Sequence, residues 1–153
     1  MMGGRILQRW RRFCALGDGD RWLIVEAVIL IGIVQAGVRT VPFGALRRLL
    51  TGAKRLRSGS RPPRSRIGWA VNAAARLVPG RTCLSDALAA DVMLCRRGYP
   101  SMLRFGVKKR NDGVVPLEAH AWVECDGSIV AGHLATLDEY RLFSNRGSPV
   151  RDV

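Results

Sequence analysis

The sequence predicts an α+β fold, with helices in the first half of the chain and a small antiparallel sheet in the second. Apolar residues recur at three- and four-residue steps over much of residues 18–100, a spacing typical of helices. From Ser101 onward they alternate with polar residues, as in strands with one buried face. A chain of 153 residues is long enough for one core, so we expect a single domain over residues 1–153.

The excess charge belongs to the first half of the chain. The formal net charge is +13; residues 1–81 hold 16 Lys and Arg against 3 Asp and Glu, and residues 82–153 hold 9 of each class. Arg-rich surfaces bind phosphates, but this one lacks interleaved aromatic residues and any helix-turn-helix or zinc spacing, so we expect no specific nucleic-acid ligand. We assign the basic helical part, residues 1–80, to docking of a peptide, an acidic partner or an anionic membrane surface.

The first strong helix signal is the apolar stretch Trp22–Val38. A membrane span needs about 20 apolar residues, and this stretch is shorter and contains Glu26 and Gln35, so we favour a buried core helix over membrane association. Asp18 or Asp20 is expected to cap its N-terminus. The first residues show no signal-peptide pattern, which favours the cytoplasm and reduced thiols.

Two more helices are expected before the turn at Pro79-Gly80. Residues 41–56 have apolar spacing with a basic face, and residues 67–78 have helical spacing up to the turn. Between them, residues 57–66 are rich in Pro, Gly, Ser and Arg, which indicates a loop.

Cys83 is expected at the start of the helix that follows this turn, in the run "RTCLSDALAADVMLCRRGYP" (residues 81–100). Unpaired backbone N–H groups and the positive end of the helix dipole favour a thiolate over a thiol at such a position. The other cysteines lack this position and are expected to be packing or near-surface residues: Cys14, Cys95 and Cys125. No CxxC pair or closely spaced Cys and His occurs, so we expect no metal and no cofactor.

Residues 101–109 and 117–133 have strand patterns, and Asp126-Gly127 is a strong signal for a two-residue hairpin turn. Counting outward from this turn makes His120 face His133 across the two strands. Alternation puts His120, Trp122 and Glu124 on one face and Ala121, Val123 and Cys125 on the other.

A cysteine at a helix start and a histidine on a strand form the arrangement that thiol catalysis requires. His120 would take the thiol proton, the Cys83 thiolate would attack a carbonyl, and the imidazolium would protonate the leaving amine. The backbone N–H of Cys83 would bind the oxyanion, and Trp122 is a candidate for substrate contact. Either residue taken alone is more often structural, so the prediction depends on the two together.

The stretches "PGRTCLSDALAADVMLCRRGYPSMLRFGV" and "EAHAWVECDGSIVAGH" resemble the transglutaminase-like cysteine peptidase domain of the lasso peptide B proteins. The likeness extends over about residues 18–142, in the layout of the stand-alone peptidase. It implies a papain-like α+β fold in which residues 81–143 form the Cys-His peptidase core. It also implies removal of the leader from a ribosomally made precursor peptide, with a separate leader-recognition protein and an ATP-dependent lasso cyclase as partners.

Matched to that family, Cys83 is the nucleophile and His120 the base. The family's third residue is an acid about a dozen positions past the histidine, where this chain has Val130–His133 and no Asp or Asn. His133 is therefore the candidate for orienting His120, with Asp138 and Glu139 as alternatives.

Two other functions stay open on the sequence. The absence of the family acid is compatible with a non-catalytic subunit that binds the leader peptide or a partner protein. The same cysteine and histidine can also transfer an acyl group to an amine rather than to water, a choice that depends on which acceptor reaches the thioester.

Overall fold

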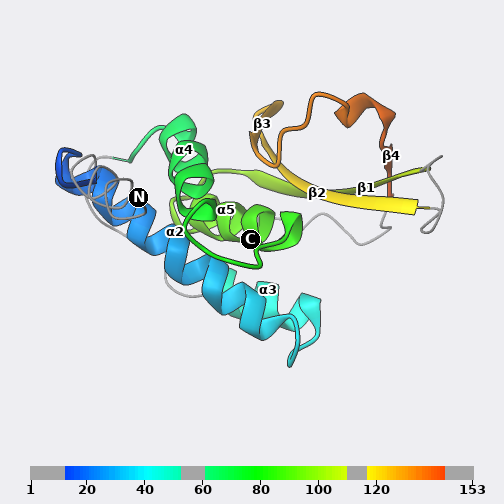
Figure 1. Cartoon of the computed structure of the whole chain (residues 1–153), viewed down its shortest axis with the longest axis horizontal. Coiled ribbons are helices and arrows are strands. Elements are labelled where there is room, and N and C mark those ends of the chain that lie inside the picture. Colours follow the sequence, from blue (N-terminus) through cyan, green and yellow to red (C-terminus); the bar gives the residue numbers. More distant parts are fainter. Residues whose placement is uncertain (1–12, 53–60, 110–116, 144–153) are drawn as a thin grey trace, which may run out of the picture.

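The computed structural model describes residues 13–52, 61–109 and 117–143. Helices gather on one side of the molecule and a twisted sheet extends from them on the other (Figure 1). The helices are α2 (Asp18–Gly37), α3 (Phe43–Gly52), α4 (Arg64–Ala75) and α5 (Cys83–Arg96), and the strands are β1 (Ser101–Lys109), β2 (Leu117–Cys125), β3 (Ser128–Ala131) and β4 (Arg141–Leu142), with a 3₁₀ turn, η1 (Leu137–Glu139). The described strands form an antiparallel sheet in the order β3-β2-β1-β4, which confirms the predicted α+β class.

Helix α2 is the core helix that the sequence predicted. One face is buried against the other helices, through Leu23, Ile24, Ala27, Leu30, Ile31 and Val34. The opposite face is exposed, including Trp22 and Ile29. Within residues 13–52, 61–109 and 117–143, no helix combines the length and apolar character that crossing a membrane requires.

The predicted cap of α2 was wrong. The helix begins at Asp18, and Gly17 occupies the N-cap position without a side-chain hydrogen bond. Asp18 and Asp20 instead lie in the first turn, where their negative charges still complement the helix dipole. Asp20 forms an ion pair with Arg66, and this pair fastens the start of α2 to α4.

Two boundaries in the basic part also differ from the prediction. Helix α4 begins at Arg64, directly after Pro63 in the N-cap position, and Arg66 is held in its first turn by the ion pair with Asp20. The last three residues of the predicted loop are therefore helical, and its residues 57–60 lie outside the described ones. Helix α3 ends at Gly52, and the rest of the predicted segment, residues 53–56, also lies outside them.

Buried charges fix α5 against its neighbours. Asp91, fully buried, accepts hydrogen bonds from Arg47 Nε of α3 at 2.8 Å and from Ser101 Oγ of β1 at 2.7 Å. Glu26 of α2 pairs with Arg97 Nη2 at 2.6 Å, and both side chains are about nine-tenths buried. Because buried charges are tolerated only when paired, these contacts define the orientation of α5.

The hairpin between β2 and β3 has the predicted turn but not the predicted register. Asp126 and Gly127 have φ angles of 47° and 72°, as a type I′ turn requires. Cys125 pairs with Ser128 as expected, but an irregularity at Val123/Glu124 then shifts the pairing, so that Val123 faces Ala131. β3 ends there, and the expected pairing of His120 with His133 was wrong because one extra residue in β3 moves every later position.

Candidate active site

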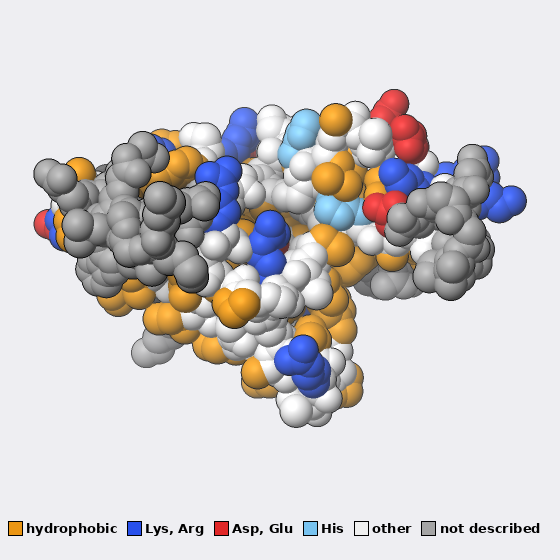
Figure 2. Space-filling view, viewed as in Figure 1, with side chains coloured by type: hydrophobic (Ala, Val, Ile, Leu, Met, Phe, Trp, Pro, Cys, Tyr) orange, Lys and Arg blue, Asp and Glu red, His pale blue; other side chains and the backbone are white. Residues whose placement is uncertain are grey.

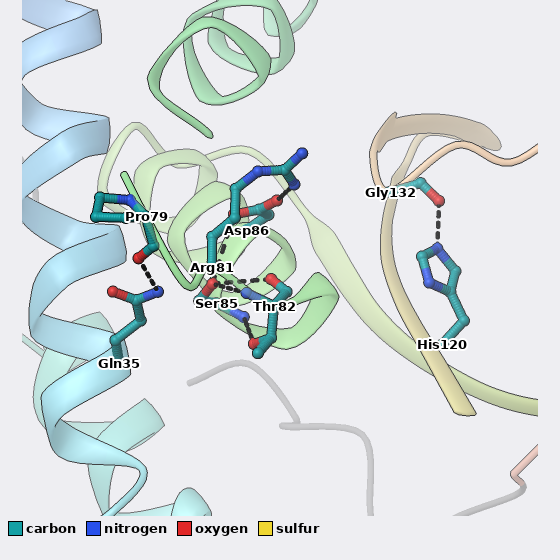
Figure 3. A network of polar contacts seen from close by, with 8 residues as sticks. All are labelled: Gln35, Pro79, Arg81, Thr82, Ser85, Asp86, His120 and Gly132. Atoms are coloured by element: carbon teal, nitrogen blue, oxygen red, sulfur yellow. Dashed lines mark hydrogen bonds and ion pairs between the residues drawn. The ribbon is translucent and has the colours of Figure 1, made fainter. Parts of the chain in front are cut away.

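Cys83 is the first residue of α5, as the sequence predicted. Thr82 caps the helix through a reciprocal pair of hydrogen bonds: Ser85 N–H donates to Thr82 Oγ1 at 3.2 Å, and Thr82 N–H donates to Ser85 Oγ at 3.0 Å (Figure 3). This capping box has Ser where Glu or Gln is usual, so it is hard to recognise in the sequence. It fixes the backbone on which the half-buried Cys83 side chain stands.

The loop before Cys83 is anchored on both sides. Gln35 of α2 donates a hydrogen bond to the carbonyl oxygen of Pro79 at 3.4 Å, and Arg81 Nη1 pairs with Asp86 at 2.6 Å. Burial raises the pKa of Asp86, while the Arg81 guanidinium opposes that rise. These contacts hold the turn and position a cation two residues before the candidate nucleophile (Figure 3).

His120 lies on β2, and its ring is bound to the backbone. Nε2 is 2.8 Å from the carbonyl oxygen of Gly132. A carbonyl oxygen only accepts hydrogen bonds, so this contact places a proton on Nε2 and leaves the lone pair of the neutral ring on Nδ1. Nδ1 is then the nitrogen available to take a proton from a thiol.

Two aromatic rings flank the imidazole. The Trp122 ring is nearly parallel to it, with centroids 6.2 Å apart and an interplanar angle of 16°, and the Tyr140 ring lies at 5.7 Å. Trp122 is only 3% exposed and its Nε1 donates to Glu124 Oε1 at 2.9 Å. So little of this ring faces solvent that the expected contact with substrate does not fit this structure, and we assign Trp122 to support of His120.

Tyr140 is a residue that the sequence analysis missed. It is 6% exposed, and its hydroxyl donates to Glu118 Oε1 at 2.7 Å while Lys108 Nζ lies 4.9 Å from the ring centroid. Burial raises the pKa of Tyr140, and the hydrogen bond to Glu118 adds to the rise, so the phenol stays protonated. The only signal was an aromatic residue directly after the polar run of η1.

The segment after β3 brings a backbone group, rather than a carboxylate, to His120. Gly132 has a φ of +82°, and an added Cβ would lie 2.7 Å from the Ala121 oxygen and 2.8 Å from Trp122. His133 is exposed, and within the described part of the chain it makes no hydrogen bond to His120. Asp138 is exposed, and Glu139 pairs with Lys108 at 3.5 Å.

The two central residues lie on elements that pack together. α5 packs against β2, yet within the described residues Cys83 and His120 share no hydrogen bond. The predicted alternation along β2 is present: Ala121, Val123 and Cys125 join the core with α5, while Trp122 packs with His120 on the other face. In Figure 3 the polar contacts at the start of α5 and the contact of His120 with Gly132 form two separate groups.

The remaining thiols have the character expected of packing or near-surface residues. Cys14 is exposed and Cys125 is buried. Burial raises the pKa of the Cys95 thiol, and the neighbouring Asp91 raises it further; burial also raises the pKa of Cys125. Among the described residues, no group of three or more His, Cys, Asp or Glu side chains is arranged to hold a metal ion.

A comparison with protein families gives a match to the Transglutaminase-like superfamily over residues 28–145. The chain belongs to this superfamily. The matched segment includes Cys83, His120 and Gly132, and the superfamily includes cysteine proteases. Neither the curated proteins nor the solved structures gave a significant match to this transglutaminase-like chain.

Proposed function

We propose that this protein is a cysteine peptidase that removes the leader from a ribosomally synthesised lasso precursor peptide in the cytoplasm. The observation that carries the proposal is the position of Cys83, at the first residue of a capped helix within a transglutaminase-like domain. A second support is the tautomer of His120, whose Nδ1 is left as the proton acceptor. The resemblance to the lasso peptide B proteins supplies the substrate class, and with it the leader-recognition protein and the lasso cyclase as partners.

In the proposed reaction, His120 Nδ1 takes the Cys83 thiol proton and the thiolate attacks the carbonyl at the junction of leader and core. The oxyanion accepts a hydrogen bond from the backbone N–H of Cys83. His120 then protonates the departing amine, and the C–N bond breaks to leave a thioester. Water, deprotonated by His120, hydrolyses the thioester and restores the thiol.

Binding of the substrate has to bring the two residues together. Catalytic hydrogen bonds are often long or absent before substrate binds, so the separate contacts of Cys83 and His120 are compatible with this reaction. In the proposal, the start of α5 is the rigid part, because its capping box and the Arg81–Asp86 pair fasten it.

A second candidate function is a non-catalytic subunit that binds the leader peptide or a partner. Two observations favour it: His120 is oriented by a carbonyl group and not by a carboxylate, and within the described residues it makes no hydrogen bond to Cys83. This candidate requires that replacing the thiol leaves maturation unchanged.

Cleavage of the cognate precursor, followed by mass spectrometry with the leader-recognition protein present, separates the two. The peptidase proposal expects cleavage by wild type and by the matched control Cys14→Ala, which alters an exposed thiol, and none by Cys83→Ala or His120→Ala. Unchanged cleavage by Cys83→Ala would leave the binding subunit as the function. Adding an amine acceptor and weighing the product tests transfer to an amine.

A further inference from the structure

A groove runs between α4 and β3, outside the group of residues around His120. Its volume is about 610 Å³. One wall is a stripe along the helix and the other is the edge strand. The stripe consists of Ser65, Trp69 and Asn72 on α4 and its C-cap residue Arg76, and the edge strand contributes Ser128, Ile129 and Val130 of β3. The α4 residues are spaced by four, three and four positions, so they follow one face of the helix.

The floor of the groove depends on Gly68. A Cβ added there would overlap the carbonyl oxygen of Val130, so only glycine lets α4 approach the strand this closely. In a two-residue hairpin, the residues flanking the turn bond to each other, and the backbone groups of the next residue point outward. Ile129 is that next residue, so its N–H and C=O point away from β2, and Ile129 also lines the groove.

The polar walls favour an anionic ligand. The charged residues in the lining are Arg64 and Arg76, with no acidic side chain among them. Arg64 is paired with Asp126 at 2.5 Å, at the hairpin end of the groove. Arg76 is exposed and makes no ion pair or side-chain hydrogen bond with the described part of the chain. On the face seen in Figure 2, Lys and Arg side chains lie over α4 and the start of α5, and others lie over α3 and at the far end of the sheet, beside acidic side chains.

Both walls of the groove are joined to the candidate active site by short stretches of chain. On the helix side, Arg76 precedes Cys83 by seven residues, through the turn that Gln35 anchors. On the strand side, Val130 precedes Gly132, the partner of His120, by two residues.

We propose that this groove binds an extended, acidic segment of the peptide substrate, remote from the bond that is cut. The inference rests on the proposed function for the identity of the ligand. From residue 65 to residue 76 the helix wall is about 16 Å long, enough for about five residues of extended peptide. The backbone of the segment forms hydrogen bonds with the N–H and C=O of Ile129. One carboxylate of the segment forms an ion pair with Arg76, and an apolar side chain of the segment packs against Trp69.

Direct binding tests the groove without turnover. The protein is Cys83→Ala, and the probe is a fluorescent ten-residue peptide with Glu at alternate positions, compared by anisotropy with the same peptide carrying Gln. Arg76→Glu is added in one variant and Arg48→Glu in the other; both change the net charge equally, and Arg48 is exposed on α3. We expect Arg76→Glu to raise the Kd of the Glu peptide at least tenfold and Arg48→Glu to raise it less than twofold.

Equal losses in the two variants would show general attraction to a basic protein and overturn the proposal, as would equal affinity for the Glu and Gln peptides. Trp69 gives a second measurement, because occupancy of the groove must change its fluorescence and Trp69→Phe must remove that change. With the cognate precursor, Arg76→Glu should raise KM and keep kcat within twofold. Cleavage by Cys83→Ala would refute the peptidase while the anisotropy result still decides the groove.

Discussion

The carbonyl oxygen of Gly132 accepts a hydrogen bond from Nε2 of His120 at 2.8 Å. The peptidases that the sequence resembles have an acidic residue about a dozen positions past the histidine, and Gly132 is twelve residues past His120. A carbonyl fixes the ring and its tautomer as a carboxylate would, but it adds no negative charge to stabilise the imidazolium. The chain thus has a group that orients His120 but lacks the negative charge of an acidic residue at this position.

Gly132→Ala is expected to disturb this arrangement. Left-handed backbone at a residue with a Cβ costs about 1–2 kcal/mol, and the contacts with Ala121 and Trp122 add the cost of overpacking, about 1–3 kcal/mol. Both the free energy of unfolding and precursor cleavage should fall. Cleavage falls because the carbonyl group that holds His120 has to move. Urea unfolding and the cleavage assay measure the two effects.

Gly127→Ala is the matched control for that substitution. Gly127 has a similar φ of +72°, but an added Cβ would have nothing within 4 Å, so it incurs the backbone cost alone. We expect it to destabilise the protein by about 1–2 kcal/mol and to preserve cleavage. Equal effects of the two substitutions would mean that Gly132 matters only for its backbone conformation.

His133→Ala distinguishes a backbone orienting group from a Cys-His-His arrangement. His133 is exposed and His120 already has a partner in Gly132, so we expect cleavage by His133→Ala to stay within about twofold of wild type. His120→Ala should lose cleavage by at least about 100-fold, the usual contribution of a general acid-base group. Similar losses in both variants would restore His133 as the orienting residue.

Breaking the buried ion pair of Glu26 with Arg97 is expected to destabilise the protein strongly. Both side chains are about nine-tenths buried, so Glu26→Ala leaves a buried guanidinium with no partner of opposite charge and should cost about 3–5 kcal/mol. Asp18→Ala removes a pair whose carboxylate is 97% exposed and should cost less than about 1 kcal/mol. Thermal and urea unfolding of the two variants give the comparison.

Much of this fold follows from local sequence signals. The turn Asp126-Gly127 sets the hairpin because both positions need positive φ, and the alternation along β2 places its two faces. Cys83 could be placed at a helix start because Pro79-Gly80 ends the preceding segment. These features depend on residues within a few positions of each other.

The other features of the fold and the site depend on contacts between segments, which the local sequence pattern does not predict. The extra residue in β3, which changes the pairing expected for His120 and His133, depends on how the two strands pack. The turn residues Asp126-Gly127 do not predict it. Gly132 was not identified because its contribution is a carbonyl oxygen, which every residue has. Tyr140 lies far from His120 in the sequence, and only the course of the chain after β3 joins them.

Acid should destabilise the protein in part through Glu124, which supports the Trp122 ring. Burial acts to raise the pKa of this carboxyl, but hydrogen bonds from Trp122 and Arg104 outweigh it, and the pKa in the folded protein lies below the usual 4.5. The unfolded chain therefore binds the proton more readily than the folded one. Glu124 contributes stability that is fully present above pH 4.5 and is lost as the pH falls through the lowered pKa.

The free energy of unfolding of Glu124→Gln should accordingly fall less than that of wild type over this window in urea titrations. Arg104→Ala, which removes one of the two donors, should give an intermediate dependence; identical slopes in wild type and Glu124→Gln would show that the pKa of Glu124 is not lowered by folding.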